Sequence, residues 1–302
     1  MEDIYKNLVF EGGGVKGIAY AGALEVLQEN GLLSGIKRVA GTSAGAITAC
    51  LVAIGYTPEE IKQHVFDMDF RKFEDGWDPL RLPAKYGLYK GDTFLEWIKG
   101  LIKKKVHIST NATFGNLREQ GLKDLYVYAT DLNIFDIKQF SADDTPNVVV
   151  AEAVRASMSI PLFFKAWKFT SNNPDNHVYV DGGVVLNYPL NVFDTVTTID
   201  DPQTLGFYLF DKQGLKSPSN LNYDEPIGYC KCLFETMLDA QDIDFSLDEC
   251  MQKRTVKIDD YGILATDFAI TDVQKNQLYE SGKKYTKAYL DSIPDLAASV
   301  TS

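Results

Sequence analysis

The sequence lacks several features that large classes of protein require. Its 302 residues include 30 lysines and arginines against 42 aspartates and glutamates, a formal net charge of −12. An acidic chain has no broad basic surface to neutralise phosphates, which argues against nucleic acid as a partner. The only cysteines are Cys50, Cys230, Cys232 and Cys250. They have neither zinc-site spacing nor a disulfide pattern, so we assign them no function and expect a reducing compartment or simple use in the core.

Long apolar runs and a secretory signal are also missing. No run reaches the roughly 18 residues of a membrane span. The stretch Met1–Lys6 contains two acidic residues. It does not have the basic segment followed by an apolar segment that a secretory signal requires. We therefore predict a cytoplasmic protein that, if it acts on lipid, does so from the water side, with export by a signal-independent route left open. Without repeats or a linker, the chain is expected to form one domain over residues 1–302, with its core at about 7–290.

One short stretch carries the strongest chemical signal. The pentapeptide Gly41–Gly45 reads G-T-S-A-G and separates the expected end of a strand, residues 37–40, from a helical pattern at residues 46–54. Glycines two positions before and after Ser43 are typical of a nucleophile elbow, a tight strand-turn-helix that holds the serine in a strained conformation. A plain Gly/Ser turn is the alternative for the pentapeptide taken alone.

A glycine loop precedes this elbow and permits two interpretations. The expected strand Asn7–Phe10 leads into Gly12–Gly17, which satisfies G-x-G-x-x-G and opens a helix from Ile18. A dinucleotide site would need a carboxylate at the end of the second strand, where this chain has Ser43 and its neighbours. We favour an oxyanion hole, in which bare amides at helix amino termini hold an anionic oxygen.

Asp181 is the candidate base for Ser43. It ends an apolar strand expected at residues 178–180, and Gly182 and Gly183 leave open backbone around its carboxylate. That placement suits proton transfer, although an Asp-Gly turn is the simpler alternative. None of the three histidines follows an apolar strand in a way that would fix an imidazole, and this includes His107 and His177. A serine-aspartate pair is therefore the better inference.

The remaining pattern predicts an α/β fold with a mostly parallel sheet. Thr57 is expected to cap a helix at residues 58–67, and an irregular flap follows at residues 66–90. The helix at residues 92–105 has a basic face, typical either of a core-packed helix or of one that lies on a membrane; we favour the core. Further strands are expected at residues 125–130, 137–140, 205–210 and 256–258, and further helices at 113–120, 148–157, 227–239 and 272–290.

Taken in order, three blocks resemble the patatin-like phospholipases: the glycine loop Gly12–Gly17, the elbow Gly41–Gly45 and the D-G-G of Asp181–Gly183. The similarity extends over most of the chain, through four further segments: Ala156–Pro161 with Phe164, Asn187 with Pro189, Gly87–Asp92, and the stretch from Phe268 to Gly282. Each block alone is weak, but the ordered set is specific.

The resemblance implies a three-layer α/β/α sandwich and calcium-independent hydrolysis of lipid acyl esters, with no cofactor or metal. By position, Ser43 would be the nucleophile, Asp181 the general base, and the amides of Gly12, Gly13 and Gly14, with that of Ala44, the oxyanion hole. Lys16 stands where family members carry Arg or Lys. The expected partner is a phospholipid or other acyl-ester lipid at a membrane or micelle surface. The sequence is silent on head group, acyl length, activator and oligomeric state.

Overall fold

The computed structural model describes residues 4–78, 80, 86–106, 109–170, 175–198, 200–214, 225–243 and 248–293. His107 lies outside these ranges. Within them, no helix is both long and apolar enough to cross a membrane.

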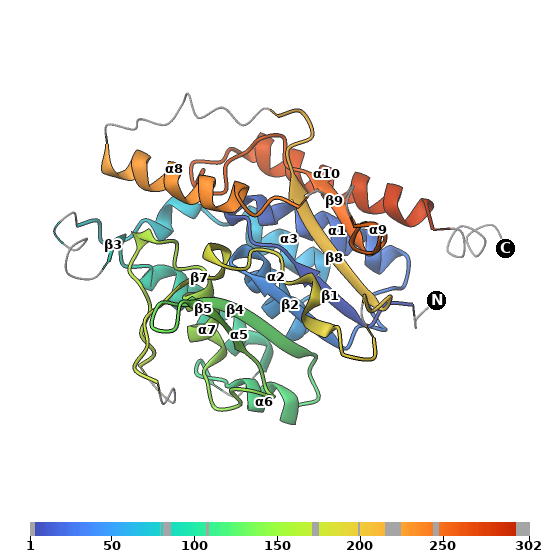
Figure 1. Cartoon of the computed structure of the whole chain (residues 1–302), viewed down its shortest axis with the longest axis horizontal. Coiled ribbons are helices and arrows are strands. Elements are labelled where there is room, and N and C mark those ends of the chain that lie inside the picture. The colour runs from blue at the N-terminus through green and yellow to red at the C-terminus, as the bar shows by residue number, and fades with distance from the viewer. Residues whose placement is uncertain are drawn as a thin grey trace.

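A mostly parallel sheet forms the centre of the fold (Figure 1). Its main path runs β5-β4-β2-β1-β8-β9, and the strands β1, β2, β4, β8 and β9 are mutually parallel. Strands β5 and β7 each pair antiparallel with β4. The bounds are β1 Asn7–Phe10, β2 Arg38–Thr42, β4 Asp124–Asp131, β5 Asp136–Phe140, β7 Tyr179–Asp181, β8 Thr204–Phe210 and β9 Thr255–Asp259. The predicted α/β class is confirmed.

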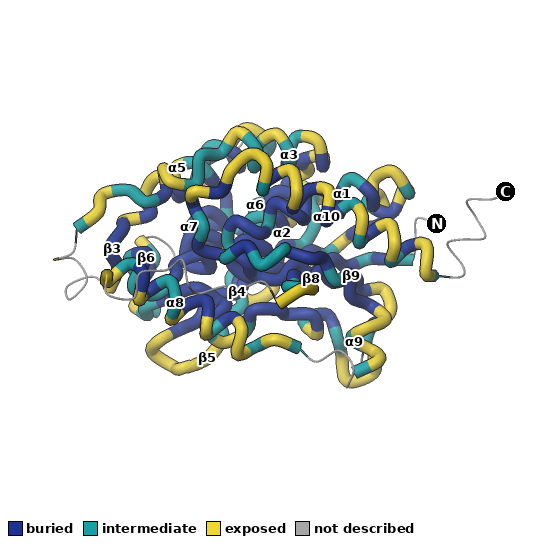
Figure 2. The backbone as a smooth tube through the Cα atoms, turned by 90° about the horizontal axis from the view of Figure 1, so that it is seen from above, coloured by how far each residue is buried: buried dark blue, intermediate teal, exposed yellow. Residues whose placement is uncertain are grey.

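Most of the helices gather on one side of this sheet (Figure 2). They are α1 Ile18–Glu29, α2 Ala44–Ala53, α3 Pro58–Phe66, α5 Asp92–Val106, α6 Phe114–Glu119, α7 Val150–Ser157 and α10 Asp272–Asp291. The other face has a thinner cover, which includes the 3-10 turn η5 Leu190–Phe193 and Met251 of α9 Glu249–Lys253. Helix α8, Pro226–Asp239, packs against the turn that follows β7.

Strand alternation explains the two unequal layers. Along β1, Leu8 and Phe10 face the large helix-covered core, while Val9 faces the smaller cluster with Tyr126 and Tyr208. Successive side chains of a strand point to opposite faces, so a strand buried on both sides reads as a continuous apolar run. This is why N-L-V-F and its neighbours look uniformly apolar in the sequence.

Helix boundaries follow local signals closely. Thr57 caps α3 with a reciprocal capping box to Glu60, and Pro58 occupies the first turn. Helix α5 buries its apolar stripe, including Phe94 and Ile98, which confirms the core-packed interpretation. The flap was expected to be irregular, but it contains the turn η2 Phe70–Phe73 and the strand β3 Gly87–Tyr89. Strand β3 pairs with a second unpredicted strand, β6 Leu162–Phe164.

The register on β4 brings two distant segments together. Tyr128 of β4 pairs with Thr42 at the end of β2, and the next residue, Ala129, pairs with Asp181 at the end of β7. Because β5 occupies the other side of β4, strands β2 and β7 lie end to end along the same side. The residue after Thr42 therefore meets Asp181 at the junction.

Candidate active site

Ser43 lies in a strained turn between β2 and α2. Its φ is 51° and its ψ −121°, a region that residues with a side chain rarely adopt. Such a conformation costs on the order of 1–3 kcal/mol and persists only where neighbouring structure enforces it. A Cβ at Gly41 would collide with the backbone of Gly45, and one at Gly45 with the backbone carbonyl of Phe10. The two glycines thus allow the tight turn that the pentapeptide predicted.

The Ser43 hydroxyl donates a hydrogen bond to Asp181. Its Oγ lies 2.7 Å from Asp181 Oδ2, and the other carboxylate oxygen accepts the amide of Gly183 at 2.8 Å. Asp181 is fully buried, and burial raises its pKa to about 7, against the opposing effect of these two hydrogen bonds. A carboxylate with that pKa can exchange a proton with an alcohol near neutral pH. The predicted meeting of Ser43 and Asp181 is confirmed.

The glycines after Asp181 permit close packing at this junction. A Cβ at Gly182 would approach Tyr128 O to 2.6 Å and Thr42 Cγ2 to 2.7 Å. One at Gly183 would lie 2.9 Å from Leu238 of α8. The D-G-G block therefore fits between β4, the elbow and α8 only without side chains.

The end of α7 holds both chemical groups. Ser157 Oγ accepts the amide of Ser43 at 2.9 Å and donates to Tyr128 O at 2.5 Å. Two residues on, the carbonyl of Ser159 accepts the amide of Asp181 at 2.9 Å. The sequence pattern gave no role to these serines, because each acts through one hydroxyl or carbonyl on a partner far along the chain.

The glycine loop lies directly against Ser43. A Cβ at Gly12 would lie 3.3 Å from Ser43 Cβ, and Gly14, at the start of the turn η1 (Gly14–Gly17), has a φ of 54°. The amide of Gly12 donates to Asn187 O at 3.0 Å, so it is not free to hold another oxygen. Among the described residues, the amides of Gly13 and Gly14 have no acceptor. Gly12 is therefore removed from the expected set of oxyanion donors. Because it has no side chain, it lets the loop lie close to Ser43.

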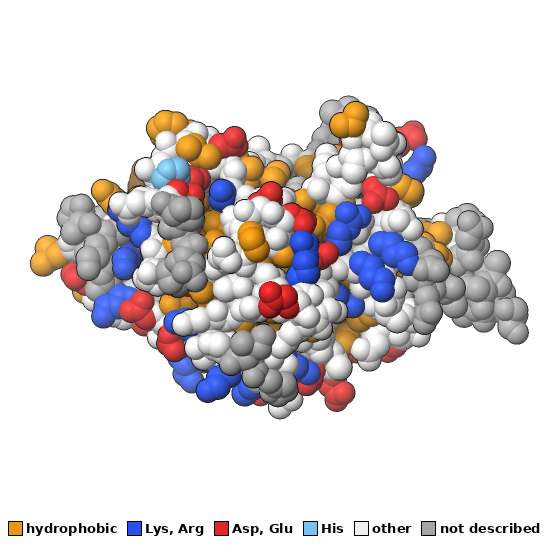
Figure 3. Space-filling model, turned by 90° about the horizontal axis from the view of Figure 1, so that it is seen from below, with side chains coloured by type: hydrophobic (Ala, Val, Ile, Leu, Met, Phe, Trp, Pro, Cys, Tyr) orange, Lys and Arg blue, Asp and Glu red, His pale blue; other side chains and the backbone are white. Residues whose placement is uncertain are grey.

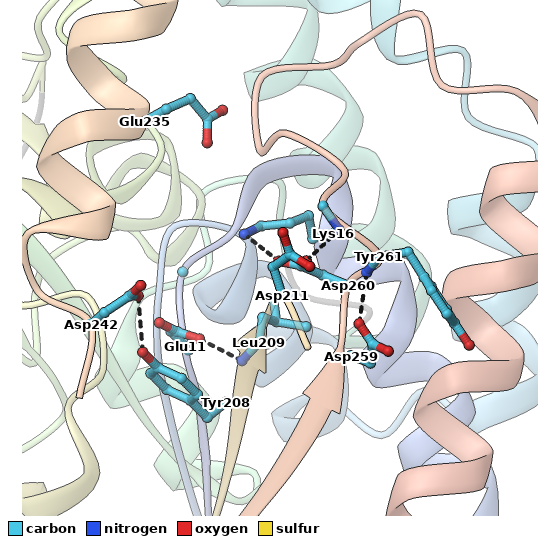
Figure 4. Close-up of polar contacts among 12 residues, drawn as sticks. Glu11, Lys16, Tyr208, Leu209, Asp211, Glu235, Asp242, Asp259, Asp260 and Tyr261 are labelled. Carbon is cyan, nitrogen blue, oxygen red and sulfur yellow. Dashed lines mark hydrogen bonds and ion pairs between the residues drawn. The ribbon is translucent and has the colours of Figure 1, made fainter. Parts of the chain in front are cut away.

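Asn187 fixes this loop from the D-G-G side. Besides accepting the Gly12 amide, Asn187 donates from Nδ2 to Glu11 Oε1 at 2.9 Å and to Gly12 O at 3.3 Å. The second oxygen of Glu11 accepts the amide of Leu209 on β8 at 2.7 Å (Figure 4). The Leu209 amide and the charge of Lys16 each lower the pKa of Glu11. Burial has the larger effect and raises this pKa to about 8. Sequence reasoning assigned Glu11 no role.

Lys16 faces away from this chemistry and pairs with Asp260. Its Nζ lies 2.8 Å from Asp260 Oδ2, with both side chains buried (Figure 4). Burial lowers the pKa of Lys16, but the carboxylates of Asp260 and Glu235 raise it above its usual range. A buried cation with a matched carboxylate holds η1 to the segment after β9. Lys16 thus lies beside the loop and makes neither a hydrogen bond nor an ion pair with Ser43 or Asp181.

Arg155 explains another block that the sequence singled out. Its guanidinium is fully buried and donates to Gly91 O at 3.0 Å, to Lys90 O at 2.7 Å and to Ser159 Oγ at 2.5 Å. Burial lowers the pKa of Arg155 to about 10. Gly91 has a φ of 69°, and a Cβ there would collide with the guanidinium. Arg155 therefore ties the G-L-Y-K-G-D block to Ser159, whose carbonyl accepts the Asp181 amide.

The described histidines have other partners. His177 Nδ1 lies 2.6 Å from Asp131 Oδ2, and the ring of His64 packs edge-on against Tyr56 with centroids 5.2 Å apart. Neither imidazole is hydrogen-bonded to Ser43. In the described part of the chain, Asp181 is thus the titratable group in contact with the Ser43 hydroxyl.

The fold and this geometry define an α/β protein with a strained serine hydroxyl paired with a buried carboxylate. A model of the patatin-like phospholipase family matches residues 8–194. The chain therefore belongs to the patatin-like phospholipase family, a family of lipid hydrolases.

Individual proteins agree with this placement. The chain is 36% identical over 303 residues to YqhO of Bacillus subtilis (strain 168), covering 95% of this chain and 98% of that protein. It is 28% identical over 197 residues to the protein named "Probable lipid hydrolase 463L" of Invertebrate iridescent virus 6, covering 62% of this chain and 63% of that protein. The crystal structure of VipD from Legionella pneumophila shares the fold, with a TM-score of 0.71, 19% identity, and 96% of this chain and 67% of that chain covered.

Proposed function

We propose that the protein is a serine acyl hydrolase that cleaves fatty-acyl esters of phospholipids or related lipids through Ser43 and Asp181. The observation that carries the proposal is the 2.7 Å hydrogen bond from Ser43 Oγ to the fully buried Asp181 carboxylate, in an elbow at the amino terminus of α2. We further propose that the core, about residues 7–290, acts as one catalytic domain, because one sheet joins its first and last strands.

The reaction follows from the positions of these two groups. Asp181 Oδ2 removes the Ser43 proton as Oγ attacks the ester carbonyl carbon, giving a tetrahedral oxyanion. The protonated Asp181 then gives that proton to the departing alcohol, leaving an acyl group on Oγ. In the second half, Asp181 takes a proton from water as the water oxygen attacks the acyl carbon. The bond to Ser43 Oγ then breaks, Asp181 returns the proton to Oγ, and the fatty acid is released.

Three backbone amides are our proposed oxyanion donors: those of Gly13, Gly14 and Ala44. The first two have no acceptor among the described residues, and Ala44 is the first residue of α2, where the helix dipole favours negative charge. Each such donor contributes on the order of 3 kcal/mol to the transition state. Asn187 positions the loop by holding both the amide and the carbonyl of Gly12.

The lipid class of the substrate rests on the family. Members are phospholipases and lipid hydrolases, and relatives of this chain carry names such as "Probable lipid hydrolase 463L" and "Triacylglycerol lipase ptl3". An acyl ester of a phospholipid or a neutral glycerolipid supplies the carbonyl that the dyad needs. The proposed hydrolysis uses water as its only co-reactant.

The test is hydrolysis of a lipid panel with product identification by mass spectrometry, comparing the wild type with Ser43→Ala and Asp181→Asn. We expect free fatty acid from the wild type and a loss of at least about 10³-fold in kcat for each variant, because the two groups act as a unit. Circular dichroism should show both variants folded.

Full activity in either variant would remove that residue from the mechanism. A wild type that hydrolyses neither the lipids nor an activated ester would indicate a family member that has lost catalysis and serves in storage or interaction.

A further inference from the structure

Large exposed hydrophobic side chains concentrate at the catalytic end of this molecule. They occur in the flap as Trp77 and Tyr86, in the β4–β5 turn as Ile134 and Phe135, and on α8 as Tyr229 and Leu233. We call these six side chains the docking face. Figure 1 shows β3, the β4–β5 hairpin and the first half of α8 at one end of the molecule, opposite α9 and the last turns of α10. Contiguous exposed apolar surface is uncommon in a monomer and usually marks a contact site.

The β4–β5 turn projects just beyond the dyad. Ala129 pairs with Asp181, and the turn begins three residues later along β4. Phe135 at its tip is 87% exposed and Ile134 53% exposed. Phe135 also has a φ of 59°, a conformation that favours glycine or asparagine over an aromatic residue. Folding alone thus gives no reason for a phenylalanine at this tip.

Helix α8 buries Phe234 and Leu238 in the core but also exposes apolar side chains on its outer side. Its outward residues Tyr229 and Leu233 are one turn apart and exposed, whereas the charged Glu235 is buried and accepts the amide and hydroxyl of Thr266, each at 2.9 Å. The exposed residues of α8 before its last residue, the exposed Asp239, are uncharged, and Lys231 beside them is partly exposed. This stripe therefore complements an uncharged surface better than it complements water.

The same helix is attached to the catalytic block. Leu238 packs against Gly183, and Gln241, just past the helix end, donates from Nε2 to Gly183 O at 2.5 Å and accepts the amide of Asn187 at 2.9 Å. A surface in contact with the exposed side of α8 is therefore separated from the block that contains Asp181 by this one helix.

We propose that the docking face seats this protein on an uncharged lipid surface, with its aromatic and aliphatic side chains inserted at the head-group level. The proposal rests on the hydrolase function proposed above, because continuity with the dyad is what identifies the occupant as lipid. Three separate segments projecting at one end suit a planar fluid surface, and Trp, Tyr, Phe and Leu are the side chains that enter such interfaces. In the view from below, hydrophobic side chains lie at the left end, several beside a histidine, with Lys and Arg side chains between them (Figure 3).

Charge selects the kind of lipid. The chain carries a net charge of −12, and the exposed Asp136 follows the hairpin turn directly. This net negative charge would repel anionic head groups. Binding therefore depends on insertion of apolar side chains into zwitterionic or neutral lipid. This distinguishes the docking face from a basic surface patch, whose binding would grow with anionic lipid.

The test is flotation of the full chain with vesicles of dialkyl-ether phosphatidylcholine, which cannot be hydrolysed at an ester. The variant is Phe135→Asn, because asparagine tolerates a positive φ and removes the apolar side chain. The matched control is Val196→Asn, a residue 97% exposed in the loop before the amino end of β8. We expect about tenfold weaker vesicle binding for Phe135→Asn, wild-type binding for Val196→Asn, and no gain from added phosphatidylglycerol.

A second readout separates this proposal from the hydrolase function. The ratio of activity on vesicle lipid to activity on a monomeric, water-soluble ester should fall about tenfold in Phe135→Asn. Equal vesicle binding by Phe135→Asn and wild type, or a Phe135-dependent dimer in sedimentation without vesicle binding, would overturn the docking face. Phe135-dependent binding by a chain that cleaves no ester would uphold the docking face and contradict the proposed hydrolase.

Discussion

Two aspartates of this chain are equally buried but have opposite kinds of partner. Asp181 and Asp260 are each fully buried. Asp260 has a lysine 2.8 Å away, whereas Asp181 has a neutral hydroxyl at 2.7 Å and one backbone amide. Burial without a cation raises the pKa of Asp181 to about 7 and leaves its carboxylate available as a base. Burial with Lys16 produces an ion pair that fixes the glycine loop in place.

The glycine loop is held in place from two sides. The carboxylate of Asp260, acting through Lys16, holds η1 to the end of the sheet, and Asn187 holds Gly12 beside Asp181. In this account the Lys16 cation lies where the glycine loop must be rigid. It is not paired with Asp181, whose carboxylate must change its protonation state.

Removing one charge of the ion pair should have the largest effect on stability. Asp260→Asn leaves the Lys16 ammonium buried without its carboxylate, and breaking a buried pair in this way costs about 3–5 kcal/mol. Urea denaturation should show that loss, and Lys16→Met should also destabilise the fold because it leaves Asp260 buried without its lysine. A double variant, Lys16→Met with Asp260→Leu, should recover part of the stability. Unchanged stability of Asp260→Asn would show that the pair does not hold the loop.

The same substitution at Asp181 should have the opposite sign. The pKa of Asp181 is raised above its unfolded value, so the folded chain binds more protons between about pH 4 and pH 7 and loses stability as the pH rises through that window. Asp181→Asn removes the buried charge and should stabilise the fold by about 2 kcal/mol at pH 8, and by little at pH 4. Denaturation at the two pH values measures this. A variant less stable than wild type at pH 8 would contradict the assigned cause of the shift.

A smaller effect is expected where Asn187 holds the glycine loop. Asn187→Ala keeps the dyad but frees the Gly12 carbonyl and Glu11 Oε1 from their shared donor. We expect kcat to fall about tenfold on a monomeric ester with KM nearly kept, because the oxyanion donors are held less precisely in the transition state. Steady-state kinetics separate the two constants. A rise in KM at constant kcat would instead assign Asn187 to substrate binding.

Much of the fold and the dyad could be predicted because their signals are local. The glycine spacing around Ser43, the threonine cap of α3 and the aspartate that ends β7 each appear within a few residues of sequence. Strand β6 was missed because its three residues, Leu162–Phe164, are too few to show a period. The elbow glycines, in contrast, could be interpreted correctly because their signal lies within the pentapeptide itself.

The supporting contacts could not be predicted because they join distant positions. Lys16 and Asp260 are 244 positions apart, and Ser157 reaches Ser43 across 114 positions. The end-to-end placement of β2 and β7 depends on the register of both strands against β4, which no local pattern contains. For the same reason the sequence could not show that the Gly12 amide is already taken by Asn187.

The central claim is that Asp181 activates Ser43 as a nucleophile. Its most direct test is the rate at which a fluorophosphonate ester labels the protein across pH 5 to 9, with the labelled residue located by peptide mass spectrometry. The account predicts a covalent adduct on Ser43, at a rate that rises about tenfold per pH unit below about pH 7 and then levels off, and that falls at least about 10³-fold in Asp181→Asn. Labelling of another residue, or of Ser43 at an equal rate in Asp181→Asn, would contradict it.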